Sequence, residues 1–158
     1  MKLSKVKSES GVASVEIVIV TPFILLMMMG GIDLARTVYQ YNTLVKNMRD
    51  ATKYISSSVR PINYNVSNTN DPEVAKYITV MAEARNLALC GKTTNCITPS
   101  VTDLSLNNIR ITYPTSVGGV TFVKMSISDF SLGFISNLFG DRLDLGEISY
   151  TMYQLQQS

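Results

Sequence analysis

The sequence predicts an α+β protein. One long N-terminal membrane-spanning α-helix continues into a small domain with a second helix and an antiparallel sheet of about three strands. Three observations predict this fold. Residues 12–32 hold a single charged residue, residues 34–55 keep a helical spacing of apolar side chains, and residues 108–155 change to an alternation of apolar and polar residues. The 158 residues leave room for one membrane span and one domain of roughly 100 residues.

The apolar run 12–32 determines on which side of the membrane the rest of the chain is expected to lie. At about 1.5 Å per residue it forms about 31 Å of helix, enough to cross the hydrocarbon core of a bilayer. Three lysines precede it within residues 1–11, which predicts a cytoplasmic N-terminus and an exported remainder. A secretory signal peptide is disfavoured, because the apolar run is longer than usual and no Ala-x-Ala-like site follows it.

Residues 33–58 are expected to extend the same helix beyond the membrane, with a heptad seam of apolar residues and a polar outer face. The helix should end near residue 57, before Arg60-Pro61. The predicted seam consists of Leu34, Val38, Tyr41, Val45, Met48, Thr52 and Ile55. The predicted outer face consists of Asp33, Arg36, Gln40, Asn42, Lys46, Asn47, Arg49, Asp50 and Lys53.

Residues 59–158 form the predicted small α+β domain. After a polar loop over 59–72, a second helix has clear end signals: Asp71 as N-cap, Pro72 in the first turn and Gly91 past the end. Its expected apolar stripe is partial and consists of Val74, Ile78, Met81, Ala82 and Leu89, with Arg85 among them.

Three strands are predicted after the second helix. The first covers residues 108–113 and stops at Pro114, the second covers 120–130 after the turn Gly118-Gly119, and the third covers 145–155. Residues 134–140 are expected to form a short helix or a loop. The three strands suggest an antiparallel meander.

The two cysteines, Cys90 and Cys96, are separated by five residues rich in glycine and polar side chains. A loop of that composition can close, and an exported compartment keeps a bridge oxidised, so a disulfide is predicted. A metal pair would need further ligands, and the chain has no histidine and no other cysteine. We expect no metal and no cofactor.

Composition disfavours catalysis and nucleic-acid binding. There is no histidine for acid–base work and no glycine-rich phosphate loop, so no catalytic residue is assigned and the protein is not expected to be an enzyme. The net charge of +2 is accounted for by residues 1–11, and no basic patch for nucleic acid follows.

Glu16 is the one acid in the apolar run, and placing an acid there costs on the order of 2–3 kcal/mol. It follows Gly11-Val12 by a short spacing, and the whole stretch Gly11-Val12-Ala13-Ser14-Val15-Glu16 resembles the processing motif of type IV prepilins and pseudopilins. The resemblance implies that a prepilin peptidase removes the basic leader 1–11 between Gly11 and Val12. It also implies an assembly role for Glu16, whose carboxylate would pair with the new amine of a neighbouring subunit.

The resemblance narrows to TadE-like minor pseudopilins of tight-adherence (Tad) pili, on Pro22 after Glu16 and on the run Gly31-Ile32-Asp33-Leu34-Ala35-Arg36. It covers residues 11–55 well, although Ile17 and Thr21 depart from the family pattern. It implies that Asp33 and Arg36 form an orienting pair at the membrane exit and that Pro22 is a point of bending. Plainer interpretations remain open. Glu16 could be an acid tolerated near the membrane interface, Pro22 a proline tolerated within a membrane helix, and Asp33 and Arg36 the solvated end of the membrane span.

The expected function is therefore that of a processed inner-membrane subunit with a periplasmic domain, which primes, caps or assembles a Tad-type pilus. The implied partners are the prepilin peptidase, other minor pseudopilins, the major pilin, the inner-membrane assembly platform and membrane lipid, with no nucleic acid. One alternative is a minor pseudopilin of a type II secretion system. Another is a membrane-anchored periplasmic scaffold or binding protein that is never processed.

Overall fold

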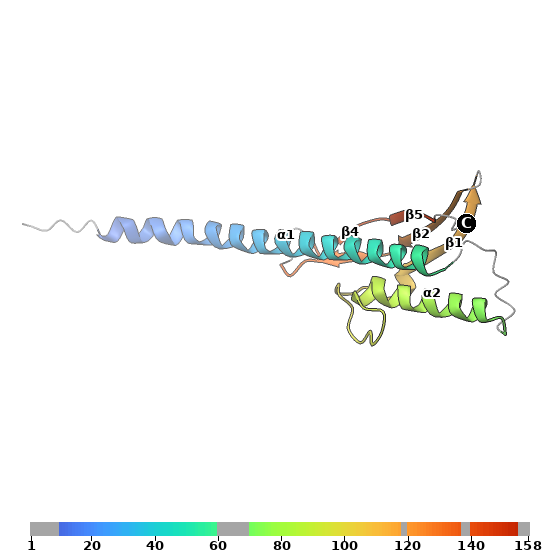
Figure 1. The fold of residues 1–158 in the computed structure, drawn as a ribbon. Helices are drawn as coiled ribbons and strands as arrows, with labels where there is room; N and C mark the ends of the chain where they lie inside the picture. The colour runs from blue at the N-terminus through green and yellow to red at the C-terminus, as the bar shows by residue number, and fades with distance from the viewer. Residues whose placement is uncertain (1–9, 60–69, 118–119, 137–139, 155–158) are drawn as a thin grey trace, which may run out of the picture.

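The computed structural model describes residues 10–59, 70–117, 120–136 and 140–154. Two helices, α1 and α2, a short 3-10 turn and five strands make up this part of the chain. Their bounds are α1 Ser10–Ser58, α2 Pro72–Cys90, the 3-10 turn η1 Leu106–Asn108, β1 Ile109–Val117, β2 Val120–Ile127, β3 Ser131–Gly133, β4 Arg142–Asp144 and β5 Ile148–Gln154. The predicted α+β class is confirmed. Figure 1 shows α1 as a long rod, with the other elements gathered along its second half.

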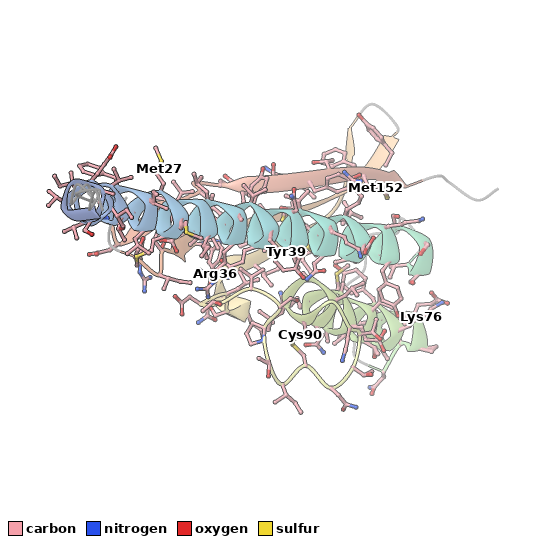
Figure 2. The ribbon with its side chains drawn as sticks, turned by 90° about the vertical axis from the view of Figure 1, so that its left-hand side faces the viewer. Met27, Arg36, Tyr39, Lys76, Cys90 and Met152 are labelled. Carbon is pink, nitrogen blue, oxygen red and sulfur yellow. A yellow bond between two sulfur atoms is a disulfide. The ribbon has the colours of Figure 1, made fainter. Side chains whose placement is uncertain are left out.

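Helix α1 agrees closely with the predicted helix of residues 12–57 and runs through Pro22 without interruption. It is long and apolar enough to cross a membrane, by length and composition. The large apolar side chains of its first half are exposed, including Phe23 and Met27. Figure 2 shows Met27 projecting outward from this part of the helix. A single long helix with a bare apolar end is thus a candidate membrane anchor.

The end signals of α2 act as the sequence predicts. The side chain of Asp71 accepts a hydrogen bond from the N–H of Glu73 at 2.9 Å, and Pro72 begins the helix. Gly91 takes a left-handed conformation with φ of 69°, and its N–H donates to the carbonyl of Leu87 at 2.8 Å. Both ends are therefore capped in the ordinary way.

The predicted apolar stripe of α2 is partly wrong. Ile78 and Ala82 are exposed, although Val74, Met81 and Leu89 are buried as expected. The face of α2 that is buried is centred on Tyr77, Ala84 and Ala88 rather than on Ile78 and Ala82, and it packs against the core. The buried residues are Val74, Tyr77, Val80, Met81, Ala84, Ala88 and Leu89.

The sheet is antiparallel with strand order β1-β2-β5. In the register, Ile109 lies opposite Ile127 on one side of β2, and Ile127 lies opposite Ile148 on the other. The prediction that β1 stops at Pro114 is wrong, because β1 continues to Val117 with a register shift between Thr112 and Thr115. β1 is an edge strand, where a proline without an N–H is tolerated at an irregularity.

A second, two-stranded sheet of β3 and β4 is inserted before β5, and the sequence did not predict it. Both strands have only three residues, too short for an alternation to be recognised. The described residues between them, 134–136 and 140–141, form no helix, which agrees with the loop alternative. In Figure 1 this hairpin lies alongside α1 and reaches further toward the apolar end of the helix than any other labelled element.

The core lies between the second half of α1, α2 and one face of the β1-β2-β5 sheet. Residues 33–58 of α1 therefore form one wall of the domain as well as continuing the anchor. The largest fully buried side chains of the core are Leu44, Met48, Ile55, Val101, Val123, Met125, Ile127 and Leu132.

The predicted heptad seam of α1 is right in its second half and wrong in its first. Met48, Thr52 and Ile55 are buried, but Leu34, Val38 and Tyr41, here called the apolar stripe, are 56%, 54% and 41% exposed. The face one residue earlier is buried instead. It includes three members of the predicted polar outer face, namely Asp33, Gln40 and Asn47. Polar side chains occupy this face because the domain meets α1 there through polar groups of its loops.

Candidate functional site

Four polar side chains form a ladder along α1 and tie it to the rest of the domain. They are Asp33, Gln40, Asn47 and Tyr54, and we call them the polar ladder. Residues seven apart are two turns apart and share a helix face. Asp33 bonds to the loop after β3 and Gln40 to the loop after α2. Asn47 bonds to that same loop and to the end of α2, and Tyr54 bonds to the middle of α2.

Asp33 is the carboxylic acid of the polar ladder, and it is buried, with only 2% of its surface exposed. Its carboxylate accepts hydrogen bonds from the N–H of Ile135 at 3.1 Å and from the N–H of Ser136 at 2.9 Å. The hydroxyl of Ser136 also donates to it. These bonds, that of the Ser136 hydroxyl above all, hold the pKa of Asp33 below its ordinary value against the opposing effect of burial. Asp33 is thus an ionised anchor for the loop after β3.

The Asp33–Arg36 pair implied by the family resemblance is not a contact pair in this structure. Among the described residues, salt bridges join Lys124 to Glu147 and Arg142 to Asp103, and none joins Asp33 to Arg36. Arg36 contributes the smallest of the effects that lower the pKa of Asp33. In Figure 2 the label of Arg36 lies beside the middle of α1. The two residues therefore act separately within one chain.

Asn47 satisfies the exposed end of α2. The last carbonyls of a helix have no partner within the helix, so other groups must bind them. The amide of Asn47 donates to the carbonyl of Ala88 at 3.5 Å and to the hydroxyl of Ser100 at 2.8 Å. Ser100 in turn donates to the carbonyl of Leu89 at 2.9 Å. Gly91 has a positive φ that favours glycine, and a β-carbon there would lie 3.3 Å from Oδ1 of Asn47, so that Asn47 would have to shift.

The predicted disulfide lies directly beyond this end of α2. Cys90 and Cys96 are bonded, with 5.6 Å between their α-carbons, and among the described residues no cysteine is free. Figure 2 shows Cys90 beside the loop that follows α2. The bridge closes residues 91–95, and the chain that follows Cys96 brings Ser100 and Thr102 back to the polar ladder, where Gln40 donates to the hydroxyl of Thr102 at 3.4 Å.

Tyr54, the last member of the ladder, joins α1 to α2 by donating its hydroxyl to the carboxylate of Glu83. This hydrogen bond, helped by burial and by the charge of Glu83, raises the pKa of Tyr54. A raised folded-state pKa stabilises the domain below the ordinary tyrosine pKa of about 10, and that contribution is lost as the pH rises through the folded value. The contact is thus stable at neutral pH.

The predicted processing site lies at the start of α1. Gly11 is in the first turn, exposed, and a β-carbon placed on it would meet nothing within 4 Å. Val12 is part of the same helix. Among the described residues, the fold therefore supplies no local reason for glycine at position 11.

Glu16 is exposed on the apolar half of α1, one turn after Val12. Within the part of the chain that the structure describes, its carboxylate has no salt bridge and no side-chain hydrogen bond. It lies 17 residues before the buried Asp33, about 26 Å along the axis of α1. The structure thus brings Asp33 into the domain and leaves Glu16 outside it.

Pro22 lies inside α1 and removes a hydrogen bond to the carbonyl of Val18. The neighbouring hydroxyl of Thr21 donates to the carbonyl of Ile17 at 2.6 Å. Figure 1 draws α1 as one continuous helix through this point. The bending at Pro22 that the family resemblance implies stays a prediction.

No group of three or more histidine, cysteine, aspartate or glutamate side chains suited to a metal ion occurs among the described residues. The start of α1, its apolar half and the segment around Asp33 are the candidate functional features of the described chain. Sequence reasoning identified Gly11, Glu16 and Asp33 as special. It missed Ile135 and Ser136, for which no local pattern gives a signal.

A candidate membrane-anchor helix that carries a small α+β domain defines the class of this protein. Residues 11–52 match the family model described as TadE-like protein, a segment from the first turn of α1 to the buried Thr52. This match confirms the predicted TadE-like resemblance over that segment and implies a protein associated with the Tad pilus. Neither the comparison with curated proteins nor that with solved structures found a match.

Proposed function

We propose that this protein is a minor pseudopilin of a Tad-type pilus. It is made as a precursor, a prepilin peptidase cleaves it between Gly11 and Val12, and α1 anchors it in the inner membrane with the domain in the periplasm. From there it joins the assembly platform, other minor pseudopilins and the major pilin to prime, cap or build the filament. The observation that carries this proposal is that Gly11 and Glu16 occur together at the start of a helix that matches the TadE-like family, and that Glu16 has no salt bridge among the described residues.

Gly11 supports processing because the fold does not explain it. An exposed helical glycine with free space around it could be alanine without a clash. Its presence is understandable if a protease must fit the backbone closely at this bond, since glycine has no side chain to obstruct that approach. The three lysines before it would hold this bond at the cytoplasmic face.

Glu16 supports assembly because a lone acid in a membrane segment is expensive and needs a compensating partner. Cleavage after Gly11 creates an α-amino group on Val12, which is positively charged over most of the range below its usual pKa of about 8. A carboxylate on one subunit and an amine on its neighbour would neutralise each other in a lipid-free filament core. The acid then favours the assembled state over the isolated one.

The apolar stripe supports packing against other helices. Leu34, Val38 and Tyr41 continue the exposed apolar surface of the first half of α1 past the predicted span, on the side not covered by the domain. An apolar stripe that the chain's own domain leaves bare is available to neighbouring helices. It gives the subunit a contact surface that extends beyond the lipid.

The test is the mass of the N-terminus of the protein isolated from membranes with and without the peptidase. A chain that begins at Val12 only when the peptidase is present supports the proposal. A chain that begins at Met1 in both samples would reject it and favour an unprocessed periplasmic scaffold.

Gly11→Ala and Gly31→Ala form a matched pair of variants for the same test. Both glycines are helical, exposed and free of neighbours within 4 Å of an added β-carbon. Gly11→Ala is expected to accumulate the precursor, and Gly31→Ala to be cleaved like the unaltered protein. Equal cleavage of both would contradict the role given to Gly11. Co-isolation with Tad rather than type II secretion components then separates the two pilus-like systems.

A further inference from the structure

We propose that the β3–β4 hairpin is a second membrane contact of this protein, held by Asp33 so that the exposed side chain of Ile135 rests in the headgroup–acyl boundary of the bilayer that α1 crosses. The occupant of this surface is the lipid interface itself. The proposal goes beyond assembly, because it depends only on α1 spanning the membrane and applies to the subunit before it enters any filament.

The position of Asp33 on α1 determines how far the hairpin lies from the end of the membrane span. Asp33 directly follows the apolar run 12–32, so it lies within about 2 Å of the end of that run along the helix axis. Its carboxylate binds the backbone N–H groups of Ile135 and Ser136. Backbone bonded to Asp33 must therefore lie at the level where the span leaves the hydrocarbon.

Burial along α1 shows that the covered face extends into the apolar run. Gly30 is one turn before Asp33 on the same face and is buried, whereas the next residue, Gly31, is exposed. The domain is thus not held away from the membrane on a stalk. In Figure 1 the hairpin is the part of the domain that reaches furthest toward the apolar end of α1.

The side chains exposed near Asp33 are apolar, which suits contact with a lipid interface. Ile135 is 63% exposed although its N–H is fixed to Asp33, and Ile32 on α1 is 60% exposed beside the same membrane level. Leu143 on β4 is 41% exposed. In water these side chains leave apolar area exposed at a cost in free energy, and contact with the acyl boundary of the bilayer would remove that cost.

The charge on the hairpin is mixed, because the exposed acids Asp141 and Asp144 flank Arg142. Two arginines nevertheless lie where they can reach the headgroup layer. Arg142 on β4 has a side chain that is 62% exposed, and its only salt bridge within the described residues, to Asp103, is long at 3.7 Å. Arg36 lies one turn beyond Asp33 on α1 and has no salt bridge among those residues. Long arginine side chains can reach headgroup phosphates from this level. Exposed apolar side chains together with nearby cations are the usual form of an interfacial contact.

The test uses the absence of tryptophan from the chain, which makes each introduced tryptophan a single reporter. The full-length protein is placed in vesicles of phosphatidylcholine and phosphatidylglycerol, with or without lipids brominated on their acyl chains. Ile135→Trp reports on the hairpin. Phe23→Trp, in the exposed apolar half of α1, is the reporter for lipid.

Tyr153→Trp is the reporter for water. Tyr153 is 71% exposed and follows Met152, whose sulfur contacts the hydroxyl of Ser56. Ser56 lies 23 residues beyond Asp33, so this reporter is about 35 Å from the membrane exit along α1. Circular dichroism and the intact Cys90–Cys96 bridge show that each variant is folded.

The proposal expects Ile135→Trp to show blue-shifted emission and to lose intensity with brominated lipid, more strongly when the bromines are near the headgroup. Tyr153→Trp should show neither change. Emission and quenching of Ile135→Trp equal to those of Tyr153→Trp would overturn the proposal. So would a blue shift without quenching, which would mean that protein rather than lipid covers Ile135.

The role of Asp33 is tested in the same reporter. Adding Asp33→Asn to Ile135→Trp should weaken the quenching, because an amide cannot accept from both backbone N–H groups as the carboxylate does. Adding Asp50→Asn, which removes an exposed acid of α1, is the matched control and should leave the quenching unchanged. Equal quenching in the two double variants would overturn the assignment of Asp33 as the anchor. Loss of quenching in Phe23→Trp would instead reject the membrane span and the proposed function with it.

Discussion

The carboxylate of Asp33 accepts a hydrogen bond from the backbone N–H of Ser136 at 2.9 Å, across 103 positions of the sequence. This contact joins the first residue after the apolar run to the loop of the β3–β4 hairpin. It is the N-terminal step of the polar ladder, and it determines where the domain begins to cover α1. An acid at a membrane exit would be expected to face water, and here it is buried because backbone N–H groups replace the water.

Replacing Asp33 by asparagine is expected to lower the melting temperature of the full-length protein in detergent micelles by several degrees at neutral pH. The carboxylate has a lowered pKa, so it contributes stability above the ordinary aspartate pKa of about 3.9. That contribution is lost as the pH falls through the lower folded value. The difference in melting temperature between the variant and the unaltered protein should therefore be full at pH 7 and shrink below about pH 4.

Asp50→Asn is the control for that measurement, because Asp50 is exposed on the same helix. Its melting temperature should follow that of the unaltered protein across the pH range. A difference for Asp33→Asn that does not change between neutral and acidic pH would show that the ionised form of Asp33 is not what anchors the loop.

Two leucines of α1 test which face of the helix the domain uses. Leu44 is fully buried, and Leu34 in the apolar stripe is 56% exposed. Leu44→Ala is expected to destabilise the domain by about 2–5 kcal/mol through lost burial and a cavity. Leu34→Ala should change stability by no more than about 0.5 kcal/mol. Urea unfolding in micelles measures both, and equal losses would mean that the apolar stripe is also covered within one chain.

Replacing Asn47 by alanine should cost about 1–3 kcal/mol, because the carbonyl of Ala88 and the hydroxyl of Ser100 lose a buried donor. Asn42→Ala, an exposed change on the same helix, is the matched control and should be nearly neutral. Proteolysis of the loop after α2 gives a local readout, since the loss should loosen that loop first. Unchanged protection of the loop in Asn47→Ala would contradict this account of the end of α2.

Replacing Glu16 by glutamine should leave folding, membrane insertion and cleavage intact, since Glu16 makes no contact with the domain in the described residues. Incorporation into sheared pili should fall severalfold, because the neutral amide cannot attract the amine of Val12 on a neighbour. The ratio of pilus-bound to membrane-bound protein measures this. The Glu16→Asp variant, which keeps the charge on a shorter side chain, should be incorporated into pili better than Glu16→Gln. If Glu16→Gln is incorporated as well as the unaltered protein, the proposed ion pair between Glu16 and the amine of Val12 is contradicted.

Sequence patterns predicted the elements of this fold that are encoded locally. The apolar run, the end signals Asp71, Pro72 and Gly91, and the alternation around Met125 each depend on neighbours within a few residues. For the same reason the TadE-like resemblance could be recognised from residues 11–55. Short β3 and β4, and the continuation of β1 past Pro114, depend on pairing partners and gave no such signal.

The sequence by itself determined the long helix, the α+β class, the disulfide partners and the residues that resemble a processing site. Only the tertiary structure decided which face of α1 meets the domain. Hydrophobic periodicity predicted the face of Leu34, Val38 and Tyr41, yet Asp33, Gln40 and Asn47 are the buried residues. The physical reason is that polar side chains become favourable in an interior once distant backbone groups satisfy their hydrogen bonds, and no local pattern specifies where those groups lie.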